Sequence, residues 1–145
     1  MKSYNAQNVI NGTFGEVWIN GDYVAEAIAL QAKITLTKAD VNMCGVLAKK
    51  SKVTGLEGKG TLKLNKVTSR MAILMSNSIK HGKQIVCTVI SALADPDALG
   101  AERVAINDVT FDELTLVDWE AKKNGEETIP FTFSDWTFLD EIAVD

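Results

Sequence analysis

The sequence is poor in the residues from which disulfide scaffolds and metal sites are usually built. Its 145 residues include two cysteines, one histidine and two prolines. Two cysteines, Cys44 and Cys87, are too few for a disulfide scaffold, and we interpret them as reduced thiols. Together with His81 they lack the spacing of zinc ligands. These shortages argue against a disulfide-stapled domain and against a structural zinc site.

The single histidine also restricts the catalytic chemistry that the chain can carry. A Ser-His-Asp or Cys-His centre would need His81 as its base, and no nucleophile motif accompanies it. Asp95 and Asp97 flank a proline without the further ligands of a calcium loop. The glycines between Gly55 and Gly60 do not have the spacing of a phosphate-binding loop. We therefore predict a protein that is not an enzyme and that has no metal or cofactor.

Long apolar runs are missing as well. No segment approaches the roughly 20 consecutive apolar residues of a membrane helix. The first 20 residues lack the basic and apolar blocks of a signal peptide, so we expect synthesis in the cytoplasm and no membrane insertion. A chain of 145 residues with 46% hydrophobic residues fits one domain over residues 1–145.

The two signs of charge are unevenly divided along the chain. The formal net charge is −4, but it is the sum of −2 for residues 1–32, +9 for residues 33–83 and −11 for residues 84–145. The middle segment has eleven basic residues against Asp40 and Glu57. A chain with this polarity has a partner of opposite charge or pairs with copies of itself.

Aromatic side chains are absent between Val24 and Thr110. Proteins that bind single-stranded nucleic acid use aromatic platforms beside their cations, and the basic segment 33–83 has none. Duplex binding through phosphates stays open, although the acidic remainder would oppose it. A small nucleic-acid-binding β-barrel module that uses residues 33–83 is therefore the alternative function. Self-association into rings or filaments explains more of the charge pattern.

The sequence does contain clear signals for β-strands. Asn20-Gly21 favours a tight hairpin turn after a strand over 14–19. Apolar residues at even positions predict a long strand over 24–37. Further strands are predicted over 61–65, 85–93, 103–109, 114–120 and 129–138. The apolar face changes within the last of these, which predicts a bend near Ser134 and Asp135.

One helix and one long loop complete the prediction. Met71, Leu74, Met75 and Ile79 form an apolar stripe at helical spacing, with Thr68 or Ser69 as the cap, His81 at the negative end of the helix and Gly82 as the stop. Residues 40–60 show no periodicity and predict a long loop that is functional or ordered by a partner. Pro130 suits the start of a strand or an edge strand. The chain as a whole is mainly β with one helix.

The sequence resembles the tail tube proteins of contractile-tailed bacteriophages, in the branch of defective prophages and phage-tail-like bacteriocins of Gram-positive bacteria. Three stretches in the same order carry the likeness. They are Ala6-Gln7-Asn8 to Gly12 with Gly15 to Asp22; Gly55, Gly58, Gly60-Thr61 and Lys66 to Ser69; and Glu102 to Val104, Asp108-Val109, Phe111-Asp112, Pro130 to Phe133 and Asp135.

This resemblance implies a β-sandwich or partial barrel with one flanking helix. It also implies six-membered rings that stack into a hollow tube inside a sheath, with a baseplate and a terminator at the ends. Strands from all six copies would join into one barrel around the lumen, and DNA would pass only if the particle is a true phage. Assembly in the bacterial cytoplasm would precede release as a phage tail or bacteriocin particle.

The resemblance also gives the predicted long loop a role. The loop over 40–60 would reach a neighbouring copy, so we expect Lys49, Lys50, Lys52 and Lys59 to contact acidic residues there. The alternative is a solvated loop, because exposed ion pairs contribute under about 1 kcal/mol.

Overall fold

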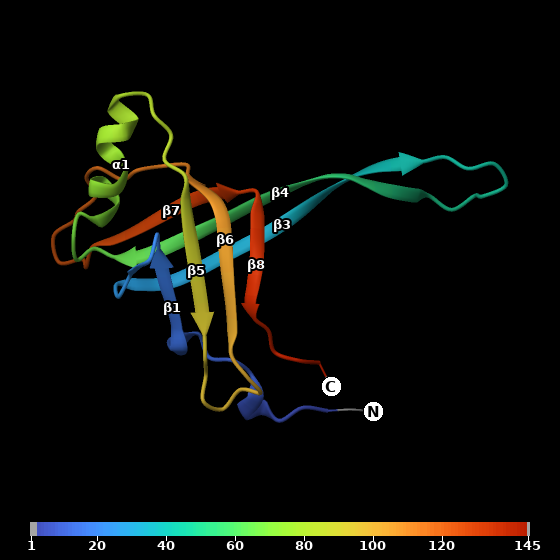
Figure 1. Ribbon diagram of the computed structural model, residues 1–145, viewed down its shortest axis with the longest axis horizontal. Helices are drawn as coiled ribbons and strands as arrows, with labels where there is room; N and C mark the ends of the chain where they lie inside the picture. Colours follow the sequence, from blue (N-terminus) through green and yellow to red (C-terminus); the bar gives the residue numbers. More distant parts are fainter. Residues whose placement is uncertain (1–2, 145) are drawn as a thin grey trace.

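The structure is a computed structural model that describes residues 3–144. It is a partial barrel of antiparallel strands with one α-helix and two short 3-10 helices among the described residues, and a long two-stranded arm extends from it (Figure 1). The elements are η1 (Ala6–Asn8), η2 (Gly12–Phe14), β1 (Gly15–Ile19), β2 (Asp22–Tyr23), β3 (Ala27–Val41), β4 (Lys50–Asn65), α1 (Arg70–Lys80), β5 (Cys87–Leu93), β6 (Glu102–Phe111), β7 (Glu126–Phe133) and β8 (Asp135–Asp140). This architecture confirms the predicted mainly β fold with a flanking helix.

Two groups of strands share β6. The strand order is β2-β1-β5-β6-β7-β4-β3, and β8 pairs with the first half of β6. The second half of β6 turns to pair with β7 through Thr110 and Phe111. Asp108, at the turn, has a φ of 56° and accepts a hydrogen bond from the Ser134 hydroxyl at 2.9 Å. This contact fixes the bend between β7 and β8 that the sequence predicted near Ser134.

The core lies between the two groups of strands. The residues of β7 alternate strictly, with every second side chain buried. Leu62 of β4 and Phe131 of β7 lie at the centre, with 0% and 1% of their surface exposed. The other buried apolar residues include Val17, Ile19, Val24, Leu64, Met71, Met75, Cys87, Val89, Ile106, Val109, Ile129 and Phe133.

Helix α1 begins and ends close to the predicted residues. Met71 and Met75 of its apolar stripe are buried against the core. His81 is the C-terminal cap, and its Nδ1 lies 2.7 Å from the Asn77 carbonyl oxygen. Gly82 follows with a φ of 68°, a conformation that glycine adopts without steric cost. Ser69 precedes the helix as expected but makes no side-chain capping hydrogen bond.

Two glycines of β4 are required by the packing of β7. Gly60 lies opposite Phe131 and Gly58 opposite Phe133 in the strand register. A Cβ at Gly60 would lie 2.3 Å from the Phe131 ring and 2.3 Å from the Gln31 carbonyl oxygen. The aromatic rings therefore cover the bare glycine backbone.

The predicted long loop over 40–60 is wrong. Residues Lys50–Asn65 form one strand paired with β3, so the connection between the two strands is only residues 42–49. The segment shows no periodicity because both faces of the arm are exposed, and a strand without a buried face has no alternation of apolar and polar residues.

Three further expectations need correction. The predicted strand over 24–37 is displaced to 27–41, because residues 24–26 form the turn between β2 and β3, in which the Ala27 N–H donates to the Val24 carbonyl oxygen. Residues 114–120 are not a strand and lie outside the sheet, where the adjacent apolar pair Leu116-Val117 breaks the two-residue alternation. Pro130 lies inside the sheet on β7, opposite Thr61. It is tolerated there because β6 pairs with β7 only as far as Phe131, so no strand on that side needs a backbone N–H donor from residue 130.

Candidate self-assembly surface

The most unusual feature of the molecule is the arm, which we define as residues 35–57. Here β3 and β4 pair only with each other, because the pairing of β4 with β7 begins at Gly58. The arm projects away from the body of the protein (Figure 1), and the side chains of residues 35–57 are exposed throughout. An isolated two-stranded hairpin is marginally stable in water, so this arm has the form of an element that another surface completes.

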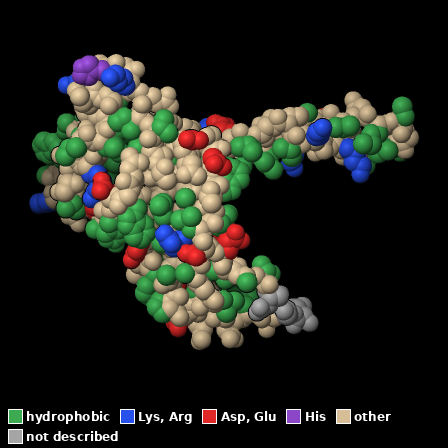
Figure 2. Space-filling view, in the orientation of Figure 1, with side chains coloured by type: hydrophobic (Ala, Val, Ile, Leu, Met, Phe, Trp, Pro, Cys, Tyr) green, Lys and Arg blue, Asp and Glu red, His purple; other side chains and the backbone are tan. Residues whose placement is uncertain are grey.

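Three of the four predicted contact lysines lie together on the arm. Lys50 and Lys52 are in the first residues of β4, and Lys49 immediately precedes them. Lys49 makes an ion pair of 3.5 Å with Asp40 of the same chain, with 79% and 59% of the two side chains exposed. Figure 2 shows the blue basic groups along the arm. An ion pair this exposed contributes little stability, which leaves these charges available.

Lys59 lies elsewhere. It is on the body half of β4, directly opposite Lys33 of β3, and makes an ion pair of 3.3 Å with Glu57. Its side chain belongs to the outer face of the β3-β4-β7 layer, opposite to the face that carries Leu62. The structure therefore separates Lys59 from the other three predicted residues.

The basic segment 33–83 is divided between different parts of the molecule. Lys38 and the three arm lysines lie on the arm, whereas Lys80 and Lys83 lie at the end of α1. Another basic side chain of this segment, Arg70, is engaged with a carboxylate inside the body. The segment is therefore not one continuous basic face.

The arm also exposes apolar side chains along its length. Leu47, in the turn, is completely exposed, with a relative exposure of 107%. Met43 and Val46 are exposed in the same turn and Val41 at the end of β3, whereas Leu36, Val53 and Leu56 are exposed farther along the arm toward the body. Exposed apolar groups gathered on one surface mark an interaction site.

A second exposed apolar group lies on the connection between β6 and β7, which spans residues 112–125. Leu116, Val117 and Trp119 have exposed fractions of 77%, 76% and 83%. The same stretch has four carboxylates, those of Asp112, Glu113, Asp118 and Glu120. We name residues 112–120 the acidic segment.

Both ends of this connection are held by the body. The Asp112 N–H donates to the Pro130 carbonyl oxygen at 2.8 Å, and the Lys66 N–H donates to the Gly125 carbonyl oxygen at 2.8 Å. The connection is therefore an anchored surface loop with exposed apolar side chains.

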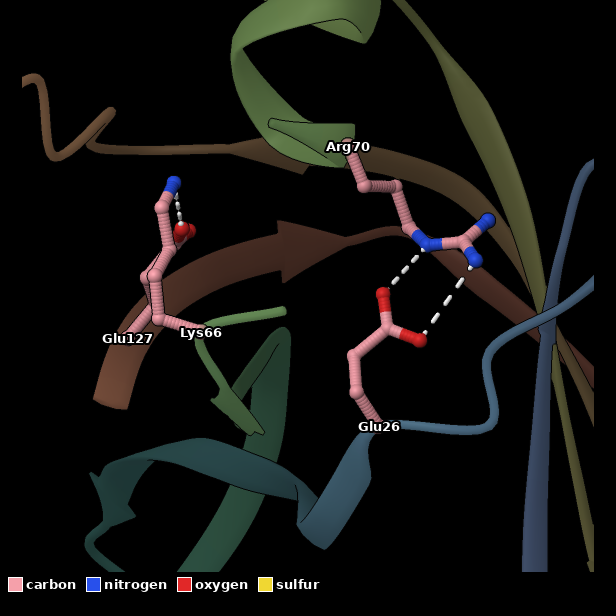
Figure 3. A network of polar contacts seen from close by, with 4 residues as sticks. All are labelled: Glu26, Lys66, Arg70 and Glu127. Carbon is pink, nitrogen blue, oxygen red and sulfur yellow. Dashed lines mark hydrogen bonds and ion pairs between the residues drawn. The ribbon is translucent and has the colours of Figure 1, made fainter. Parts of the chain in front are cut away.

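Two ion pairs stabilise this end of the molecule (Figure 3). Arg70 of α1 donates from Nε to Glu26 Oε1 at 2.7 Å, and the Glu26 side chain is only 8% exposed. The hydrogen bond from Arg70 lowers the pKa of Glu26, against the effect of burial. Lys66 binds Glu127 Oε1 on the core side of β7, while Glu127 Oε2 is buried without a partner among the described residues.

The sheet has open edges. β3 ends the strand order, so its outer edge pairs with no other described strand, and β8 pairs only with β6. Exposed strand edges are templates for pairing with another chain. The outer face of the β3-β4-β7 layer is polar, with Gln31, Lys33, Thr35, Lys59, Thr61, Thr128 and Thr132 on it.

The residues that could support other chemistry lie apart from one another. His81 caps α1, while Asp95 accepts the backbone N–H groups of Asn11 and Asp97. Cys44 is exposed in the arm turn and Cys87 is buried in β5, where desolvation raises the pKa of its thiol. Within residues 3–144, His, Cys, Asp and Glu side chains form no group suited to a metal ion. No helix in this range has the length and apolar character needed to cross a membrane.

Sequence reasoning missed the exposed apolar residues of both surfaces. The regular spacing used to find strands detects a buried face. The arm has none, and in the acidic segment Leu114 alone among the apolar residues packs against the core. The available signal was the placement of Leu116, Val117 and Trp119 among four carboxylates, a mixture unusual for a core strand.

The chain is similar to known proteins over nearly its whole length. Residues 2–140 match the family described as phage tail tube protein. The chain is 32% identical over 140 residues to phage-like element PBSX protein XkdM of Bacillus subtilis strain 168, and the alignment covers 95% of each protein.

Solved structures share the fold. A chain in the anti-feeding prophage cap, described as the tube terminating cap, superposes with a TM-score of 0.72 at 12% identity and 97% coverage of both chains. A chain in the extended sheath-tube complex of the extracellular contractile injection system PVC gives a TM-score of 0.70 at 11% identity, with coverage of 94% and 98%. At these identities the likeness concerns the fold.

Proposed function

This chain belongs to the phage tail tube protein family, and on that premise we propose that it builds the inner tube of a contractile phage tail or a phage-tail-like bacteriocin. Six copies would form a ring, and rings would stack into a hollow tube inside a sheath. A baseplate and a terminator would bound the tube, and the subunit would have a structural, non-enzymatic role. The assembled tube would leave the bacterial cytoplasm as part of the released particle.

The observation that carries this proposal is the arm. Residues 35–57 expose seven large apolar side chains, those of Leu36, Val41, Met43, Val46, Leu47, Val53 and Leu56, on a two-stranded ribbon that its own chain leaves uncovered. Burial of apolar surface is worth about 25 cal/mol per Å², so contact with a neighbouring copy would both order the arm and hold the copies together.

The open strand edges support ring formation. The outer edge of β3 and the edge of β8 lie at different margins of the molecule, so one can face the other when copies are arranged side by side. Closure of a sheet into a barrel removes such edges. The polar outer face of the β3-β4-β7 layer would then line a hydrated lumen, which DNA would traverse only in a true phage.

Electron microscopy of the concentrated purified protein tests the proposal. We expect six-fold rings or stacked tubes, and a protein that is monomeric at every concentration would contradict it. The two native cysteines add a chemical measurement, because Cys44 is exposed on the arm and Cys87 is buried. A maleimide should label Cys44 in the monomer but much more slowly in tubes, while Cys87 should stay unlabelled in both as the internal control.

A further inference from the structure

We infer that the arm of one copy docks on the acidic segment, residues 112–120, of a neighbouring copy. This inference rests on the proposed tube function and names the surface that receives the arm. The partner is a second copy of this chain. Three features of the structure carry the inference: the positions of the two surfaces, their charge and their exposed apolar groups.

The two surfaces lie at opposite ends of one strand. β4 starts in the arm at Lys50 and ends at Asn65, which pairs with Glu126 at the end of the 112–125 connection. The connection and α1 lie at the end of the body away from the arm (Figure 1). A contact between opposite ends of identical chains is heterologous, and its repetition extends an assembly.

The charges of the two surfaces are complementary. The arm, residues 35–57, has Lys38, Lys49, Lys50 and Lys52 against Asp40 and Glu57, a net charge of +2. The acidic segment has Asp112, Glu113, Asp118 and Glu120 and no basic residue, a net charge of −4. Complementary potentials favour this pairing and oppose arm-to-arm or segment-to-segment contact.

Each surface has exposed apolar groups that can supply the buried centre of a contact. Trp119 is 83% exposed with Leu116 and Val117 beside it, and the arm turn presents Leu47 at 107% and Met43 at 53%. Tryptophan is strongly enriched among the residues that dominate binding energy. A rim of lysine and carboxylate groups around such a centre is the usual anatomy of a protein interface.

The acidic segment is also prepared for binding. Its start is held by the Asp112 N–H bond to Pro130, and the connection ends at Gly125, which accepts from the Lys66 N–H. Lys66 is itself fixed by Glu127. A loop that is anchored before association loses less conformational entropy when it binds.

Matched charge reversals test the docking. We expect Lys50→Glu/Lys52→Glu to raise the concentration needed for tube assembly by about ten-fold or more, and Asp118→Lys/Glu120→Lys to do the same. Combining the four substitutions should restore assembly to within about three-fold of the natural chain. The control, Lys80→Glu/Lys83→Glu at and just after the end of α1, changes the net charge by −4, as Lys50→Glu/Lys52→Glu does, and should leave assembly near the natural value.

Disulfide trapping tests the same contact by proximity. Cys44 lies in the arm turn and Val117 in the acidic segment, so Val117→Cys in assembled tubes should give a covalent ladder of subunits under mild oxidation. The control is Ile73→Cys on α1. Ile73 is 81% exposed, and this variant should give no ladder. Adding Cys44→Ser to Val117→Cys should abolish the ladder.

The outcomes separate the inference from the proposed function. A natural chain that never assembles contradicts the tube function itself. If the natural chain forms tubes but the variant that combines all four charge reversals does not regain assembly, only the docking site is wrong. The same holds if Val117→Cys gives no ladder in those tubes. If Asp118→Lys/Glu120→Lys leaves tubes intact but weakens binding of sheath protein, the acidic segment is a sheath surface and the inference is wrong.

Discussion

The two halves of β4 belong to one continuous strand but lie in opposite environments. Residues 58–65 pair with β3 on one side and β7 on the other, and Leu62 and Leu64 are 0% and 3% exposed. Residues 50–57 pair with β3 alone, and all of their side chains are exposed. One strand therefore contributes to the core of the subunit at one end and to the arm at the other.

This difference separates the residues that stabilise the subunit from those that are available for assembly. The stability of the isolated subunit depends on the body half, where apolar residues are already buried. The arm half has comparable apolar residues, Val53 and Leu56, but 46% and 52% of their surface stays exposed in the subunit. Substitutions in the two halves should therefore separate the free energy of unfolding of the subunit from its ability to assemble.

The largest expected difference concerns core side chains. Phe131→Ala removes a ring with 1% exposure that covers Gly60, and we expect a loss of about 3–5 kcal/mol in the free energy of unfolding. Leu56→Ala, on the arm half, should change it by less than about 0.5 kcal/mol. Urea denaturation of the monomer measures both. Equal losses for the two variants would show that the arm contributes to the subunit core.

A pair of glycines on the same strand gives the next largest difference. Gly60→Ala should cost about 1–3 kcal/mol, because its Cβ would overlap the Phe131 ring and the Gln31 carbonyl oxygen. Gly55→Ala, in the arm, places its Cβ no closer than 3.9 Å to Thr37 and should change stability by less than about 0.5 kcal/mol. Thermal unfolding of both variants tests this, and a stable Gly60→Ala protein would contradict the described packing.

The ion pairs extend the comparison to charge. The pKa of Glu26 is lowered by Arg70, so this carboxylate contributes stability above its unfolded pKa of about 4.3. That contribution is lost as the pH falls through the lower folded pKa. Glu26→Gln should cost roughly 1–2 kcal/mol at neutral pH and should flatten the decline of stability in acid.

The matched control is Glu57→Gln, at the boundary of the arm. Glu57 pairs with Lys59, but 60% and 67% of the two side chains are exposed. We expect a change below about 0.5 kcal/mol in the free energy of unfolding at neutral pH. Equal losses of stability for the two glutamine variants would show that the buried pair contributes no more than the exposed one.

The sequence predicted the body better than the arm for a physical reason. Alternation and helical spacing are produced by burial, so β7, the buried Met71 and Met75 of α1 and the bend near Ser134 were correctly predicted, whereas Ile79 of the predicted stripe is 52% exposed. The Asn20-Gly21 turn was found because both residues have positive φ, 51° and 87°. The arm half of β4 has no buried face within its own chain, and its missing periodicity was interpreted as a loop.

The candidate surface was predictable only in part. The excess of lysines identified Lys49, Lys50 and Lys52, which the structure places on the arm, but Lys59 lies on the body half of β4. Residues 114–120 of the acidic segment were predicted as a strand, but Leu116, Val117 and Trp119 are exposed there. Their exposure depends on where β6 ends and β7 begins, which is a property of the tertiary fold.

The smallest effect on unfolding provides the sharpest test of the comparison. Leu47 in the arm turn is fully exposed, so Leu47→Ser should change the free energy of unfolding by less than about 0.5 kcal/mol. The same substitution removes an apolar group from the surface proposed to hold copies together, and we expect tube assembly to need about ten-fold more protein. Ile73→Ser, at an exposed apolar position on α1, is the control and should leave assembly unchanged. Sedimentation and negative-stain microscopy measure assembly, while urea denaturation of the monomer measures stability. A Leu47→Ser protein that assembles like the natural chain would show that the exposed arm does not hold the tube together.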